Sequence, residues 1–139
     1  MGRLRSRGIG SEAHTEAEQA ALRANRDYYE AFEARDIDAM SDAWEHSDRV
    51  ACTHPGWRTL HGWAAVAGSW VAIFGGPQQL QFVLTDERVS VEGDTAWVTV
   101  DENLIEPSGT SGTVAATNVY VFDGERWKMV VHHGCPVAG

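Results

Sequence analysis

Apolar residues in the first half of the chain recur at the three- and four-residue spacing of helices. This spacing predicts a long helix over residues 15–35. A short second helix follows, with Asp36 as its N-cap and with Ile37, Met40 and Trp44 on one face. A third helix is predicted from Trp63 to Phe74, because a Gly-Gly-Pro sequence follows and ends it.

The second half of the chain changes to the alternating pattern of strands. Before it, residues 49–53 predict one short strand that a Pro-Gly turn ends. The alternation then predicts four long strands, over residues 79–91, 95–105, 113–122 and 127–133, with a loop over residues 107–112. Helices followed by a strand meander are typical of one α+β domain, here residues 14–139. A curved sheet whose concave face is covered by helices tends to enclose a cavity.

Composition and charge narrow the class of partner. The chain has 139 residues, 43% of them hydrophobic, and a formal charge of −9, which disfavours nucleic acid. Its basic cluster of Arg3, Arg5 and Arg7 lies in a leader, residues 1–13, that we expect to be disordered. The sequence has no run of about 20 apolar residues and no apolar stretch behind the leader's charges. We therefore expect a cytoplasmic protein that does not bind membranes, with Cys52 and Cys135 as free thiols.

Strand alternation sorts the candidate interior residues by face. Val98, Val100 and Glu102 share one face of their strand, and Asn118 and Tyr120 share one face of the next. Asn118 is a polar residue in an otherwise apolar row. It is either a partly exposed strand residue or one of a few polar groups in an apolar pocket, and the sequence leaves both interpretations open.

The last strand is ambiguous, because two histidines adjoin each other and must point to opposite faces. Hydrophobicity favours the set Trp127, Met129, Val131 and His133 as the inward one. The six histidines also suggest a metal site, but no helical His-x-x-x-His pair and no Cys–His cluster is present, so no metal is predicted.

Several segments resemble the nuclear-transport-factor-2-like superfamily, and more narrowly its SnoaL-like members. They are residues 33–40 (EARDIDAM), 52–57 (CTHPGW), Gly62, 93–96 (GDTA), 116–120 (ATNVY) and 127–133 (WKMVVHH). The resemblance implies a cone-shaped, strongly curved antiparallel sheet, with three helices from the N-terminal half covering its concave face. It also implies a small-molecule pocket without a cofactor, which takes a small apolar organic ligand.

The ketosteroid isomerases of this superfamily are similar at three polar positions. His54 stands before Pro55 where they place a general-base Asp, Tyr28 falls where they place an oxyanion-hole Tyr, and Asn118 matches their protonated Asp. The resemblance implies acid–base chemistry beside a carbonyl, with His54 as base and Tyr28 and Asn118 polarising the substrate. Glu102 or His132 would orient His54 or relay protons. The pocket would be lined by Trp57, Trp70, Val98, Val100 and Tyr120.

The chain is also similar to the association domain of calcium/calmodulin-dependent kinases, and this similarity places His132 inward. We follow it for the last strand. Two functions remain open: an isomerase, cyclase or lyase without a cofactor, and a non-catalytic ligand-binding or oligomerisation domain. A metal-dependent enzyme is a third, weaker alternative. In each case we predict a homodimer, since Trp97 and Val119 on the outer sheet face need cover.

Overall fold

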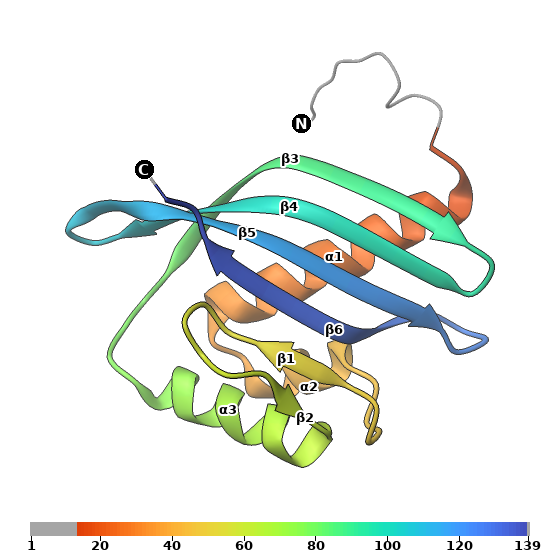
Figure 1. Ribbon diagram of the computed structural model, residues 1–139, viewed down its shortest axis with the longest axis horizontal. Coiled ribbons are helices and arrows are strands. Elements are labelled where there is room, and N and C mark those ends of the chain that lie inside the picture. Colours follow the sequence, from red (N-terminus) through yellow and green to blue (C-terminus); the bar gives the residue numbers. More distant parts are fainter. Residues whose placement is uncertain (1–13, 139) are drawn as a thin grey trace.

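The computed structural model describes residues 14–138, in which three helices lie against one six-stranded sheet (Figure 1). The helices are α1 (Glu16–Ala34), α2 (Ile37–Ala43) and α3 (Trp63–Gly75). The strands are β1 (Ala51–Thr53), β2 (Leu60–His61), β3 (Gln81–Glu92), β4 (Thr95–Glu106), β5 (Gly109–Phe122) and β6 (Trp127–Pro136), in the order β2-β1-β6-β5-β4-β3. The predicted α+β class and curved, cone-like sheet are confirmed. The predicted leader lies outside the described residues.

The first helix places the side chains that matter most for the interior. A capping box between Thr15 and Glu18 begins α1, and Arg35 ends it in the left-handed conformation with φ 54°. The helix crosses the sheet and contacts β3, β4 and β6 (Figure 1). Its inward face includes Asn25, Tyr28 and Tyr29, all buried, so two consecutive tyrosines both enter the core.

The sheet differs from the expected one in three places. The pair β1–β6 is parallel, so the sheet is mixed rather than wholly antiparallel. No hairpin joins these strands, because α3 and four strands separate them in the chain. The strand β2 was not predicted, since two residues are too few to show alternation. Residues 107–112 are mostly strand, because the β4–β5 pairing extends to Glu106 and Gly109.

A β-bulge in β6 decides which of its histidines points inward. The register with β5 shifts by one residue at Val130, and this reverses the facing of every later residue in the strand. Met129 is inward before the bulge and His132 after it, while Val131 is half-buried and His133 is exposed. The inward set predicted from hydrophobicity is therefore correct for Trp127 and Met129 and wrong for Val131 and His133, and the inward placement of His132 is correct.

The core lies between the helices and the concave face of the sheet. Its largest fully buried side chains are Trp44, Trp70, Tyr28, Tyr120, Met40 and Met129. Trp44 follows α2 and pairs with Met129 of β6 in an isolated bridge, which joins the α2 end of the chain to the sheet. No helix within residues 14–138 has both the length and the apolar content needed to span a membrane.

Candidate functional site

The sheet register brings the predicted polar residues together. His132 of β6 is the direct partner of Asn118 on β5 and of Cys52 on β1, and His54 follows Cys52 two residues later. The rings of His54 and His132 are 6.4 Å apart, centre to centre. From α1, the ring of Tyr28 lies 5.2 Å from that of His132. All four predicted polar residues in this cluster are at most 3% exposed.

A chain of hydrogen bonds runs from the rim of the cone to its centre. It begins at Glu87, which a second β-bulge, between Thr85 and Arg88, brings within reach of Asn25. The Nδ2 group of Asn25 donates to the Glu87 carboxylate at 2.8 Å. Its Oδ1 atom accepts from the hydroxyl of Tyr120 at 2.7 Å and from Nδ2 of Asn118 at 2.9 Å. The carboxylate at the rim therefore sets the orientation of both buried amides.

The orientation of Asn118 fixes the tautomer of His132. Because Nδ2 of Asn118 donates to Asn25, its Oδ1 atom faces Nδ1 of His132 at 2.6 Å and can only accept. The network thus assigns the ring proton of His132 to Nδ1 and leaves Nε2 unprotonated. Burial lowers the pKa of His132 to about 3, because desolvation disfavours the imidazolium, so the ring is neutral near pH 7.

Tyr29, which the sequence analysis did not select, joins Asn118 to Glu102. Its hydroxyl donates to the Glu102 carboxylate at 2.6 Å and accepts from Nδ2 of Asn118 at 3.1 Å. Burial raises the pKa of Glu102 to about 7, while the Tyr29 hydrogen bond acts in the opposite direction. The predicted residue Glu102 therefore titrates near neutral pH and is linked to His132 through two intermediate side chains.

His54 belongs to a separate group of contacts. The Ser69 hydroxyl donates to the carbonyl of Val66 at 2.7 Å, so it accepts from Nε2–H of His54 at 2.9 Å. This arrangement leaves Nδ1 of His54 unprotonated. Burial lowers the pKa of His54 to about 4. The edges of Trp57 and Trp70 pack against its ring, with each pair of ring centres 4.8 Å apart.

Two buried hydrogen-bond donors in the same cluster have no partner among the described residues. They are the hydroxyl of Tyr28 and the indole Nε1–H of Trp70, and both side chains are fully buried. The two rings are in edge contact, with centres 5.9 Å apart. A buried donor without a hydrogen-bond partner lowers the stability of the fold by about 1–3 kcal/mol. Each of these donors belongs to a ring that contacts a neutral histidine, Tyr28 beside His132 and Trp70 beside His54.

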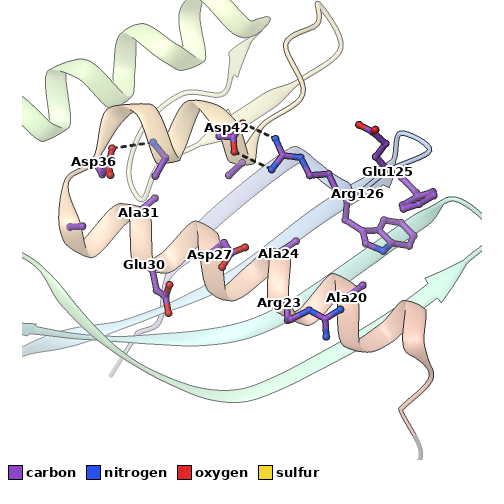
Figure 2. Close-up of a pocket in the computed structure, with 15 residues that line it drawn as sticks. Ala20, Arg23, Ala24, Asp27, Glu30, Ala31, Asp36, Asp42, Glu125 and Arg126 are labelled. Atoms are coloured by element: carbon purple, nitrogen blue, oxygen red, sulfur yellow. Dashed lines mark hydrogen bonds and ion pairs between the residues drawn. The ribbon is translucent and has the colours of Figure 1, made fainter.

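The predicted pocket lining is buried, with one exception. Trp70, Val98, Val100 and Tyr120 are at most 3% exposed and belong to the packed core, whereas Trp57 is 45% exposed. Two hollows in the described part of the chain lie elsewhere. The larger, about 590 Å³, is lined by α1, α2 and the β5–β6 hairpin (Figure 2). The smaller lies near the C-terminal end of α1. None of the predicted site residues lines either hollow.

The sequence analysis missed Asn25, Tyr29, Ser69 and Glu87. Asn25 carried a usable signal, since it lies one helical turn before Tyr28 and Tyr29 on the inward face of α1. Glu87 carried none, because only the bulge brings it to Asn25. Within residues 14–138, no three His, Cys, Asp or Glu side chains are grouped so as to hold a metal ion.

Comparisons with known proteins agree with this architecture. Residues 21–139 match the model of a family described as SnoaL-like domain. A solved structure from Streptomyces avermitilis, assigned as a dehydratase of the NTF2-like family, is 37% identical, covers 88% of this chain and 96% of its own, and superposes with a TM-score of 0.80. A structure from Thiobacillus denitrificans, assigned as a calcium/calmodulin-dependent protein kinase type II association domain, is also 37% identical, covering 83% and 93%, with a TM-score of 0.72.

A plant relative is similar over a shorter share of its length. The F-box protein SKIP8 of Arabidopsis thaliana is 31% identical over 115 residues, which are 83% of this chain and 48% of that protein. The chain therefore spans about half the length of the curated relative that it matches.

Removal of the hydroxyl should affect the free energy of unfolding differently at the two adjacent tyrosines. Tyr29→Phe leaves the Glu102 carboxylate and one N–H of the Asn118 amide without this partner, and should lower the free energy of unfolding by about 1–3 kcal/mol. Tyr28→Phe removes an unpartnered donor and should change it by less than about 0.5 kcal/mol, or increase it. Urea denaturation of both variants measures the difference. Equal losses would show that the network does not distinguish them.

The depressed pKa of His54 predicts a pH-dependent stability. Below its ordinary pKa of 6.5 the unfolded chain binds a proton that the folded chain does not take up until about pH 4. The contribution of the neutral His54 to the free energy of unfolding is therefore complete above pH 6.5. It is lost as the pH falls to 4, at about 1.4 kcal/mol per pH unit. Urea denaturation from pH 6.5 to 4.5 should show a slope shallower by this amount in His54→Gln.

The exposed His61 offers a matched control for this measurement. His61→Gln should keep the slope of the unchanged protein. The same slope in all three proteins would contradict a neutral, buried His54.

Proposed function

The chain belongs to the SnoaL-like domain family. From this premise we propose that it binds a small apolar carbonyl compound inside its cone. It would transfer a proton from the carbon next to the carbonyl, without a cofactor. The observation that carries the proposal is the pair of unpartnered donors on Tyr28 and Trp70, next to two neutral histidines. The reaction class is that of an isomerase, cyclase or lyase.

In this proposal the two donors bind the carbonyl oxygen, and the two histidines position the ligand and transfer the proton. The Tyr28 hydroxyl and the Trp70 indole would donate to the carbonyl oxygen and stabilise the charge that develops there. His54 would accept the proton at Nδ1, since it is neutral at pH 7 and its other nitrogen is held by Ser69. His132 would orient the ligand or relay the proton. Its position is set by Asn118, whose own amide is fully used in the network.

Entry to the cone would take place beside Trp57. This residue follows the end of β1 in a turn and is 45% exposed, while its ring edge covers His54. We propose that its side chain moves aside to admit the ligand and then excludes water. An uncharged ligand fits best, since no Lys or Arg side chain of residues 14–138 belongs to the cluster. The cytoplasmic location expected from the sequence stays a prediction.

Deuterium exchange tests the chemistry without knowledge of the product. A panel of apolar cyclic ketones and enones is incubated with the protein in D2O, and proton NMR follows the loss of the hydrogens beside the carbonyl. We expect at least one compound to exchange faster with the protein than without it. His54→Gln should slow this exchange about 100-fold or more while the Kd of the compound is kept, because only the base is lost.

Two further variants control this experiment. Tyr28→Phe should also slow the exchange, whereas His61→Gln, which alters an exposed histidine outside the cluster, should leave it unchanged. Binding without exchange for every compound would instead favour the non-catalytic function.

That second function, a ligand-binding or oligomerisation domain, has its own support. The chain is 37% identical to the assigned association domain, and an apolar row crosses the outer face of the sheet. In this row Trp97 of β4, which is 40% exposed, pairs with Val119 of β5, and Val119 pairs with Val131 of β6. We propose that this face forms a homodimer.

Light scattering coupled to size-exclusion chromatography tests the homodimer. The unchanged protein should elute with twice the mass of one chain, and Trp97→Glu should elute as a monomer, because it places a charge in the apolar row. Trp57→Glu, which alters the other exposed tryptophan, should stay a dimer. A monomer in all three cases would contradict the proposal.

A further inference from the structure

The larger hollow lies outside the cone and has features that the proposed function does not use. Its floor is formed by small side chains of two facing helices, Ala20, Ala24, Ala31 and Ala34 of α1 with Ala39 and Ala43 of α2. Phe122 and Trp127 line it at the β5–β6 hairpin. We call this hollow the α1–α2 groove. Its volume of about 590 Å³ is enough for several side chains.

Acidic side chains dominate the rim of the groove. Five carboxylates line it, on Asp27, Glu30, Asp36, Asp42 and Glu125, against the two guanidinium groups of Arg23 and Arg126.

Some of these charges already have partners. Asp42 binds Arg126 through two hydrogen bonds of 2.6 and 3.0 Å, and Asp36 caps α2 (Figure 2). Within residues 14–138, the side chains of Asp27, Glu30 and Glu125 make no ion pair and no hydrogen bond. Among these residues, the groove therefore offers three carboxylates and one guanidinium, that of Arg23, without an ion pair or a hydrogen bond, around an apolar floor.

We propose that the segment of this chain before α1, residues 1–13, docks in the α1–α2 groove. The segment carries Arg3, Arg5 and Arg7 against the single acid Glu12, in a chain whose formal charge is −9. Three guanidinium groups thus face a rim whose unpaired side chains are three carboxylates and one guanidinium. Leu4 and Ile9 provide apolar side chains for the alanine floor.

The chain length permits this contact. Arg7 stands eight residues before Thr15, which an extended chain spans in about 26 Å. From Thr15 to Glu30 along α1 is about 22 Å. Arg7 can therefore reach the free carboxylates on α1, and Arg3 and Arg5 have more chain available.

Tethering makes a weak contact sufficient. Exposed ion pairs contribute little individually, so a free peptide of this sequence would bind weakly. The short connection to α1 gives the segment an effective concentration on the order of millimolar. The docked state should then be populated at low salt and lost at high salt, because exposed charges are screened.

Paramagnetic relaxation enhancement in the full chain tests the proposal. A nitroxide is attached through Ser6→Cys, with the exposed Cys135 replaced by Ser; Cys52 is fully buried and burial raises its pKa to about 12, so it stays unlabelled. At about 20 mM NaCl we expect strong broadening of the amide signals of Ala24, Asp27 and Glu30 and of the Trp127 indole. At about 500 mM NaCl the broadening should fall more than twofold.

Charge variants identify the partners. Asp27→Asn with Glu30→Gln should reduce the broadening at Trp127 at least twofold, as should replacement of the three leader arginines by Gln. Asp48→Asn with Asp94→Asn is the matched control, since it removes two exposed carboxylates outside the groove. This control should keep the broadening.

Three results would overturn the proposal. Broadening confined to the first turn of α1, or insensitive to salt, would show that the segment does not dock. Equal loss in the control pair would show a response to net charge alone. Broadening in a mixture of nitroxide-labelled chains with unlabelled, nitrogen-15-enriched chains would assign the groove to a second copy of the chain.

Discussion

The interior of the cone depends on one requirement: polar side chains inside an apolar shell must satisfy each other. Asn118, fully buried at the centre of β5, meets this requirement by using its whole amide, donating to Asn25 and Tyr29 and accepting from His132. A half-satisfied network would cost more than an apolar core of the same volume. The packing of α1 on the sheet and the register of β5 with β6 must both be kept for these bonds to form. Among the described residues three buried donors stay unpartnered, and two of them, on Tyr28 and Trp70, adjoin this network.

The sequence was sufficient for the fold because its signals are periodic. Helical spacing and strand alternation locate every element longer than three residues, and the alternation in β4 and β5 correctly places Val98, Val100, Glu102, Asn118 and Tyr120 inward. Alternation failed in β6, where one extra residue reverses the facing of the strand. It also could not find a strand as short as β2 or the parallel pairing of β1, since neither leaves a periodic trace.

The candidate site was only partly predictable, for a different reason. The sequence identifies residue types that suit chemistry, but the partner of each hydroxyl or amide depends on geometry of a few tenths of an ångström. Tyr28 and Tyr29 are adjacent and both buried, yet only Tyr29 reaches Glu102. Asn118 was interpreted as a group that polarises a ligand, whereas its amide already holds its neighbours. Trp57 was assigned to the pocket lining, and it covers His54 from the solvent side. Proteins of the same fold carry unlike assigned roles, a dehydratase and an association domain, so the decision lies in such details.

The bulge at Val130 also affects how relatives of this chain should be compared. Facing in a strand depends on whether the count of residues from a fixed point is odd or even, and the bulge changes that parity between Met129 and His132. A relative without the extra residue would present a different member of its last strand to the interior, even at high identity. An alignment gap placed one residue away would then equate an inward histidine with an outward one. Before a role is transferred between members of this family, the residues of β6 should therefore be counted, to establish whether the extra residue of the bulge is present.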